Sequence, residues 1–343
     1  MHAHLSSTRE LILSLESAIG EDIIGQHDLI RKLIITLLAW GHALIEWVPG
    51  LGKTKTVKTL ARVLGYDSKR ISFTPDLLPT DLTGTEIYRP QTSKFETRKW
   101  PIFTNILLAD EINRTPPKVQ SALLEAMEEW HVTIANDTLP LPSPFFVIAT
   151  QNPLEHEGTY PLPEAELDRF FMKIVLTYPS PEDEKKIWLT STQKEQKSKS
   201  NPIIISPAEL IEMRDYLREH ILVDEKIYDY VSDILEMTRS RDWWKTLTQT
   251  KNNLTPKLSD TKEQKNISDS LSYGASTRAG MALISGARIV ALMDGRDYTT
   301  PDDIKYIAHD ILRHRIGLSY EAISEHITTD SIISEILDTV RIP

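Results

Sequence analysis

A stretch of small and basic residues, Val48-Pro49-Gly50-Leu51-Gly52-Lys53-Thr54, has the composition of a phosphate-binding loop. It follows the short apolar run 43–45 and precedes a segment with helical spacing of apolar residues. In that context, backbone amides at a helix start surround phosphates, a lysine reaches the β- and γ-phosphates, and a hydroxyl binds Mg²⁺. We therefore predict a nucleotide site in which Lys53 and Thr54 have these roles. A glycine-rich turn without a ligand is the alternative. The residues expected to line the loop are Pro49, Gly50, Leu51, Gly52 and Lys55.

Two acids, Asp110 and Glu111, end the apolar run 106–109. Acids at the end of a buried strand are costly unless they face a site. Asp110 is therefore expected to hold Mg²⁺ through water, and Glu111 to polarise an attacking water. A solvated strand end is the alternative. Asn152, after the run 145–149, is expected to hydrogen-bond the γ-phosphate or that water, although an asparagine after a strand is usually only a turn residue.

The elements that must position these residues alternate between strand and helix over the first 180 residues. Strands are expected at 43–45, 106–109, 145–149 and 172–176, and helices at 26–39, 53–64 and 116–130. This alternation predicts a mostly parallel sheet covered by helices on both faces.

Beyond Pro179 the pattern predicts only helices, and therefore a second, all-helical domain. Thr300, Pro301 and Gly317 mark the start and the end of the clearest helix. Two polar segments, 190–201 and 246–272, are expected to be a linker and a mobile loop. The helices are expected at 181–192, 206–219, 224–240, 276–294, 300–316 and 320–338.

The composition excludes several classes of protein. The chain has 343 residues, no cysteine and a net charge of −10, so disulfides, thiolate metal sites and a wholly basic surface are excluded. The first residues lack a signal-peptide layout, and the longest apolar run, 33–40, is far shorter than the roughly 20 residues of a membrane span. We therefore expect a cytoplasmic protein without a membrane segment.

Five segments together resemble the MoxR family of AAA+ ATPases. They contain the sequences DEINR (110–114), SALLEAMEE (121–129), ATQNP (149–153), EGTYPLPEA (157–165) and LDRF (167–170). The segments 24–26, 274–279 and 312–316 resemble further parts of the same family, so the resemblance covers roughly residues 10–320. It implies an α/β fold, in which an AAA+ P-loop NTPase core with a parallel sheet is followed by an all-α lid domain.

The resemblance also implies a division of the chain and further site residues. The core is expected at 1–180 with an insertion at 76–103, a linker helix and polar linker at 181–202, and the lid at 203–343. Arg169 resembles the arginine finger, which reaches a neighbouring subunit's γ-phosphate, although a surface ion pair with Asp168 or a nearby Glu is the alternative. Arg278 resembles the sensor 2 arginine, acting on its own or a neighbour's nucleotide. Ile24, Gly25 and Gln26 resemble the family's N-terminal segment on the adenine side of the nucleotide.

By this resemblance we expect an enzyme that binds ATP and Mg²⁺, hydrolyses ATP and remodels a client protein complex. Such proteins form rings, here expected to be hexameric, and often act with a partner that carries a von Willebrand factor A domain. Two alternatives are a nucleotide-insensitive scaffold and a nucleic-acid motor. The second is indicated only by a weak basic cluster, Lys94, Arg98 and Lys99, so nucleic acid is not the expected partner.

Four tryptophans stand where the family has glycine: Trp40, Trp47, Trp100 and Trp130. Trp47 occupies the first glycine of the phosphate loop, where a large side chain is hard to place. Glycine makes up only 13 of the 343 residues, below the usual share of about 7%. We hypothesise that UGA codons are read as glycine in the source organism and were translated as tryptophan. A natural loop variant with crippled nucleotide binding is the alternative.

Overall fold

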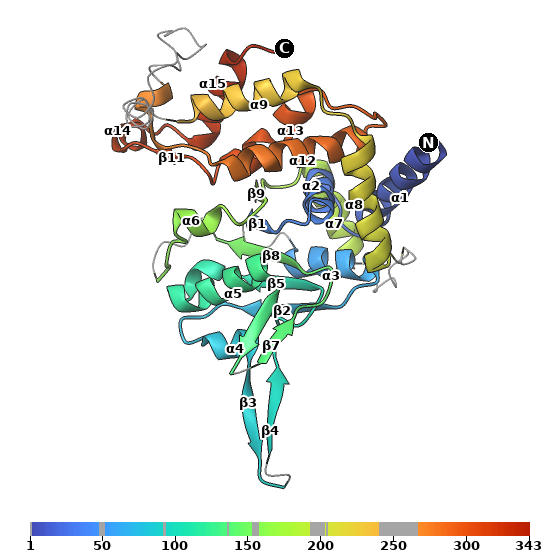
Figure 1. Cartoon of the computed structure of the whole chain (residues 1–343), viewed down its shortest axis with the longest axis vertical. Helices are drawn as coiled ribbons and strands as arrows, with labels where there is room; N and C mark the ends of the chain where they lie inside the picture. The colour runs from blue at the N-terminus through green and yellow to red at the C-terminus, as the bar shows by residue number, and fades with distance from the viewer. Residues whose placement is uncertain are drawn as a thin grey trace. The chain divides into compact units, whose positions relative to one another are not determined.

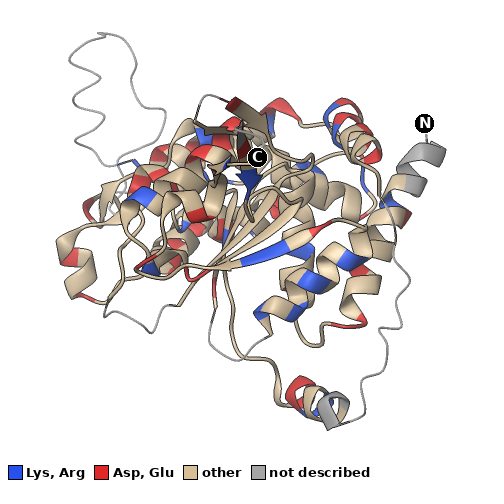
Figure 2. Cartoon of the chain, turned by 90° about the horizontal axis from the view of Figure 1, so that it is seen from below, with Lys and Arg blue, Asp and Glu red and all other residues tan. Residues whose placement is uncertain are grey.

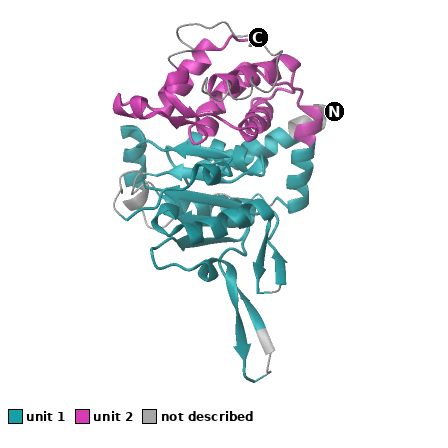
Figure 3. Cartoon of the chain, turned by 60° about the vertical axis from the view of Figure 1, so that its left-hand side comes forward, with its two compact units in different colours: residues 1–215 teal, residues 216–343 magenta. Residues whose placement is uncertain are grey.

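The computed structural model describes residues 2–47, 52–91, 94–135, 137–152, 158–192, 203, 205–239 and 267–343. The chain forms two compact units, Met1–Asp215 and Tyr216–Pro343, drawn in different colours in Figure 3. The boundary between them falls inside helix α8 (Pro207–His220). The domain limits expected at residues 180 and 202 stay predictions, and most of the segment 246–272 lies outside the described residues.

The first unit is built on a five-stranded parallel sheet in the order β2-β5-β8-β1-β9. The predicted parallel sheet is thereby confirmed, and four of its strands lie where apolar runs indicated them. The fifth, the edge strand β2, was not predicted because only one of its five residues is buried. The strands are β1 (Ala43–Glu46), β2 (Ser68–Ser72), β5 (Ile106–Asp110), β8 (Phe146–Gln151) and β9 (Met172–Val175).

Helices pack on both faces of this sheet. Alternate residues of each strand point to opposite faces, so each strand supplies side chains to both sides. On one face, Leu107 of β5 and Val147 of β8 share an apolar core with Leu123 of helix α5 (Pro117–Glu129). The other helices that pack on the sheet or on one another include α1 (His2–Gly20), α2 (His27–Leu38) and α3 (Lys53–Leu64), of which α3 contacts β2 and β5 and α2 contacts β9.

An antiparallel hairpin of β3 (Gly84–Arg89) and β4 (Lys94–Lys99) projects from the body of the first unit (Figure 1). This hairpin and helix α4 (Pro79–Thr83) lie within the range 76–103, where an insertion was predicted from the family resemblance, and that assignment stays a prediction. A second, shorter hairpin and three helical segments complete the elements of this unit before α8. They are β6 (His131–Ile134), β7 (Asp137–Pro140), the 3₁₀ turn η1 (Ile112–Arg114), α6 (Glu164–Leu167) and α7 (Pro181–Thr192).

The second unit is helical, as expected, apart from two short strands. These strands, β10 (Leu271–Tyr273) and β11 (Gly317–Leu318), pair antiparallel and were not indicated by the sequence. The helix expected at 320–338 is instead two helices, because the chain turns at His326, which has a positive φ of 60°. The helices are α9 (Glu225–Met237), α12 (Thr277–Met293), α13 (Pro301–Leu312), α14 (Tyr320–Ser324) and α15 (Thr329–Thr339).

The start of α13 shows why the sequence specified it well. Asp303 Oδ2 accepts hydrogen bonds from the backbone N–H of Thr300 at 2.7 Å and from the Thr300 hydroxyl at 3.0 Å. The same carboxylate accepts hydrogen bonds from two guanidinium nitrogens of Arg296, at 2.6 and 2.8 Å. In the described ranges, none of the helices combines the length and hydropathy needed to cross a bilayer.

Two of the four unusual tryptophans have left-handed backbone conformations. Trp40, just after α2, has a φ of 57°, and Trp130, at the end of α5, has a φ of 59°. This region favours glycine, and it is strained for a residue with a bulky side chain. The two rings lie 5.6 Å apart, and the buried indole nitrogens of Trp40 and Trp47 have no hydrogen-bond partner.

Candidate functional site

The predicted site residues of the first unit gather at one edge of its sheet. Strands β5, β8 and β1 are neighbours and run parallel, so their carboxyl ends lie side by side. Asp110 ends β5, Asn152 directly follows β8, and the chain after β1 leads to Lys53 at the start of α3. Ligands of open parallel sheets bind at this edge. The loop residues Pro49, Gly50 and Leu51 lie outside the described residues.

Asp110 is the centre of a cluster of polar contacts. Its Oδ1 accepts a hydrogen bond from the Thr150 hydroxyl at 2.7 Å and lies 3.4 Å from Lys53 Nζ. Its Oδ2 accepts a hydrogen bond from a guanidinium nitrogen of Arg70 at 2.6 Å. Burial acts to raise the pKa of Asp110, but the Thr150 hydroxyl and the cations of Arg70 and Lys53 outweigh it and hold that pKa below its usual value. Asp110 is therefore an ionised carboxylate at neutral pH.

Glu111 turns away from the strand that carries Asp110, because its φ of 59° lies in the left-handed region. Its backbone N–H donates to the Thr150 hydroxyl at 3.0 Å, and its Oε2 is 3.0 Å from a nitrogen of Arg114. The strained backbone of a non-glycine residue at this point is typical of functional sites. The carboxylates of Asp110 and Glu111 are therefore both held by contacts to neighbouring side chains.

A cavity of about 130 Å³ lies beside the start of α3. Four of the residues expected to bind nucleotide line it: Ile24, Gln26, Gly52 and Lys55. Gly25, between two of these positions, has a φ of 75°, and a Cβ there would lie 2.9 Å from Asp183 Cβ. The cavity has both apolar and polar residues in its lining, which is completed by Asp22, Ile23, Thr56, Pro179 and Ile187.

The donors at this edge fit a Mg²⁺–nucleotide complex. Thr54 brings a hydroxyl on the first turn of α3, and Asp110 brings an ionised carboxylate, which are the oxygen ligands that Mg²⁺ prefers. Lys53 is close enough to Asp110 to lie between that carboxylate and the phosphates of a bound nucleotide. A small cavity lined in part by isoleucines, next to a cationic helix start, matches a base joined to phosphates.

The two arginines expected to act on nucleotide are placed differently. Arg169, just after α6, forms an ion pair with Glu128 at 3.1 Å, which is the kind of contact named as its alternative. That contact leaves its role as a finger untested, because a finger acts on another subunit. Arg278 belongs to the second unit, where it lies in the first turn of α12 behind the cap residue Ser276.

Two residues of the cluster were not predicted. Thr150 lies inside the segment ATQNP (149–153), and its position on the strand before Asn152 could have indicated it. Arg70 lies on the unpredicted strand β2, 40 residues before Asp110 in the sequence, and no pattern connects the two.

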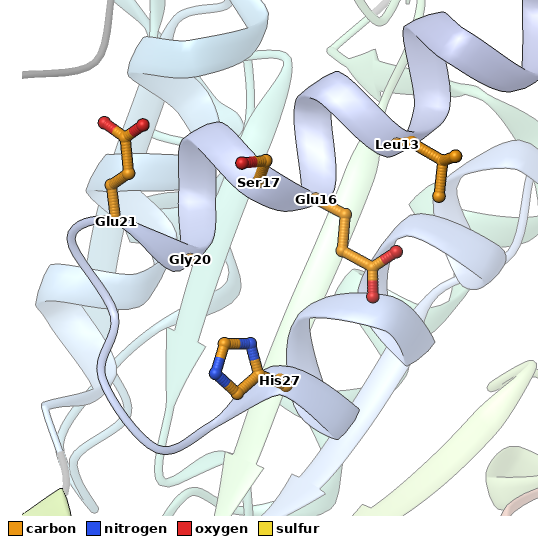
Figure 4. Close-up of a pocket in the computed structure, with 6 residues that line it drawn as sticks. All are labelled: Leu13, Glu16, Ser17, Gly20, Glu21 and His27. Atoms are coloured by element: carbon orange, nitrogen blue, oxygen red, sulfur yellow. The ribbon is translucent and has the colours of Figure 1, made fainter.

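A second hollow, of about 480 Å³, lies between α1 and α2 and contains none of the predicted site residues (Figure 4). Its acid Glu16 is paired with Arg31 at 3.9 Å, and His27 lies across from it. Over the described residues, no group of three acids or histidines is arranged to hold a metal ion. We assign this hollow no role.

Comparison with known proteins agrees with this geometry. A family model described as "ATPase family associated with various cellular activities (AAA)" matches residues 42–172, and a model described as "AAA lid domain" matches residues 263–336. The protein named Chaperone MoxR1 of Mycobacterium tuberculosis is 43% identical over 96% of this chain and 82% of its own length. The YeaC protein of Bacillus subtilis, which has no assigned function, is 42% identical over 95% of this chain and 92% of its own.

A solved structure extends the comparison to three dimensions. The crystal structure of a candidate ATPase from Cytophaga hutchinsonii superposes with a TM-score of 0.85, at 42% sequence identity, over 99% of this chain and 97% of that one. Matches of this extent and identity cover both units and all the motifs described above. The chain therefore belongs to the MoxR family of AAA+ ATPases.

Proposed function

We propose that this protein binds ATP and Mg²⁺, hydrolyses the ATP and uses the cycle to remodel a client protein complex. The observation that carries the proposal is the convergence of Lys53, Thr150 and Asp110 at the edge of the sheet, beside the cavity lined by Ile24 and Gln26. The relative named as a chaperone supports a protein client.

Each residue of the site then has a defined task. Lys53 neutralises the β- and γ-phosphates, while Thr54 and, through water, Asp110 hold Mg²⁺, which supplies charge neutralisation at the phosphates. Glu111 accepts a proton from the attacking water, and Asn152, which is buried, orients that water or the γ-phosphate. Ile24, Gly25 and Gln26 contact the base beside the loop.

We propose further that the chain works as a ring, a hexamer, in the cytoplasm. In a ring, Arg169 reaches the nucleotide of the next subunit, and release of Arg169 from Glu128 is needed for that reach. Arg278 acts as sensor 2. A partner with a von Willebrand factor A domain presents the client. In Figure 2, basic and acidic residues are interspersed along the described ribbon, which fits a protein client better than a polyanion such as nucleic acid.

The decisive experiment measures ATP affinity and turnover in matched lysine variants. Lys53→Ala is expected to abolish nucleotide binding, whereas Lys58→Ala, an exposed lysine on the same helix, is expected to leave it unchanged. Glu111→Gln is expected to bind ATP but hardly hydrolyse it. Equal ATP affinity in the two lysine variants would refute the site.

We also propose that the native protein has glycine at positions 40, 47, 100 and 130. The left-handed backbones of Trp40 and Trp130 support this, since such a conformation costs an L-residue about 1–2 kcal/mol that glycine avoids. The partnerless indole N–H of Trp47 adds about 1–3 kcal/mol, because a buried donor has lost its water.

Peptide mass measurement on protein isolated from its source organism tests the glycine proposal directly. Glycine at position 47 would support it, and tryptophan would overturn it. In parallel, ATP binding is compared between the chain as printed and Trp47→Gly. If the printed chain forms its oligomer but neither form binds ATP, the scaffold function replaces the ATPase.

A further inference from the structure

Arg70 is a cation at the site that has no task in the proposed ATPase cycle. It lies on the edge strand β2, whose register places Arg70 beside Leu108 and Ser72 beside Asp110. Its neighbour Ile71 is buried, whereas the Arg70 side chain is 49% exposed and reaches along the strand to Asp110. The guanidinium therefore comes from the solvent side of the sheet edge to a carboxylate that is only 8% exposed.

The contacts of Asp110 leave neither of its oxygens open. Oδ1 is shared by the Thr150 hydroxyl and Lys53, and Oδ2 is taken by Arg70 at 2.6 Å. A nucleotide would draw Lys53 to its phosphates, and a neutral hydroxyl does not repel a cation. With Lys53 drawn to the phosphates, Arg70 is the remaining group that both covers an oxygen of Asp110 and brings a charge of the same sign as Mg²⁺.

We propose that Arg70 competes with hydrated Mg²⁺ for Asp110, so that the two cations exchange on this carboxylate as the nucleotide binds. The proposal rests on the ATP and Mg²⁺ site proposed above. In the nucleotide-free chain Arg70 and Lys53 together neutralise Asp110, a largely buried charge that Lys53, at 3.4 Å, would otherwise face alone. When Mg²⁺ arrives, the guanidinium swings back to solvent.

The exposure of the partners decides which of them gives way. Thr150 is fully buried, and Lys53 is 15% exposed, so both are confined. The Arg70 side chain is half exposed and lies on β2, an edge strand of the sheet formed by the described residues. An ion pair with one exposed partner costs little to break, which makes the exchange reversible.

The expected consequence is a change in the Mg²⁺ requirement, measured by binding rather than by turnover. Affinity for a fluorescent ATP analogue is followed by anisotropy while Mg²⁺ is titrated from EDTA-treated protein. Arg70→Gln is expected to lower the Mg²⁺ concentration for half-maximal binding about fivefold, which corresponds to the upper range for a partly exposed ion pair. The difference is expected to shrink at high salt, because exposed charges are screened.

The neighbouring variant Lys69→Gln is the matched control, since it removes the same charge from the same strand and is expected to leave the Mg²⁺ requirement unchanged. In an Asp110→Asn background, Arg70→Gln is expected to have no effect, because the carboxylate for which the cations compete is gone. Thermal unfolding of each variant verifies that it is folded.

An Arg70→Gln titration that overlaps the unsubstituted chain, or that needs more Mg²⁺, would overturn the proposal; the second result would mean that Arg70 orients Asp110 for the metal. Equal shifts in Arg70→Gln and Lys69→Gln would also overturn it, because they would reflect net charge alone. If the analogue binds neither the printed chain nor Trp47→Gly at any Mg²⁺ concentration, the proposed ATP site fails, and this inference fails with it.

Discussion

The buried His42 makes the stability of the first unit depend on pH in a calculable way. His42 precedes β1, and its Nδ1 accepts the backbone N–H of Val147 at 3.1 Å, so its Nε2–H donates to the Met127 carbonyl at 3.2 Å. Burial lowers its pKa from 6.5 to about 4, against the opposing effect of the Met127 hydrogen bond. The folded protein therefore holds this ring neutral at pH values where the unfolded chain protonates it.

The sign follows from counting protons. Between pH 6.5 and about pH 4, the unfolded state binds a proton at His42 that the folded state does not, so stability falls as the pH falls through this window. Above pH 6.5 the contribution of this residue is constant. At about 1.36 kcal/mol for each pKa unit, the loss reaches about 3 kcal/mol at the lower end of the window.

Urea unfolding at a series of pH values, in the unsubstituted chain and in His42→Gln, measures this contribution as a difference between two curves. The glutamine cannot titrate, so the free-energy gap between the two proteins is expected to change by about 3 kcal/mol from pH 7 to pH 4, in favour of the variant. A gap that does not vary with pH would refute the neutral, buried histidine.

Three further predictions concern other parts of the chain. Mixing Arg169→Ala with Glu111→Gln is expected to restore part of the ATP turnover that each variant lacks, since a mixed ring contains intact interfaces; no recovery would argue against a finger that acts between subunits. Asp303→Asn is expected to destabilise the second unit by about 2 kcal/mol, because it breaks the bidentate pair with Arg296; a urea midpoint near that of the parent protein would contradict this. Gly41→Ala is expected to yield little folded protein, as measured by circular dichroism, because the alanine Cβ would lie 2.2 Å from the Cβ of the buried Phe171.

The sheet shows which strands the sequence could predict. The apolar runs at β1, β5 and β8 mark central strands that are buried on both faces, which is typical of a parallel sheet. Strand β9, at the other edge, was still predicted, because Met172 and Ile174 are apolar and buried. Strand β2 reads Ser-Lys-Arg-Ile-Ser, and as an edge strand it buries only Ile71, so its pattern is that of a loop. The pair β10–β11 has too few residues to show a period at all.

The site residues differ in the same way, because some follow from a local sequence pattern and others depend on contacts between distant segments. Lys53, Asp110 and Asn152 were predicted because each directly follows a recognisable strand or phosphate-loop pattern. Arg70 was missed because its role depends on the pairing of β2 with β5, which only the folded sheet determines. The left-handed backbones of Trp40 and Trp130 likewise needed coordinates, although the residue types had already marked these positions as unusual.

The hydroxyl of Thr150 gives the site a fixed direction. It has one hydrogen, which it gives to Asp110, and it receives the backbone hydrogen of Glu111. The amide, the hydroxyl and the carboxylate therefore form a one-way relay of donors that ends on a negative charge and cannot reverse while Asp110 is ionised. A serine at this position would preserve the relay and a valine of nearly the same shape would cut it, so the backbone of one acid is tied to the charge of the other by a single oxygen atom.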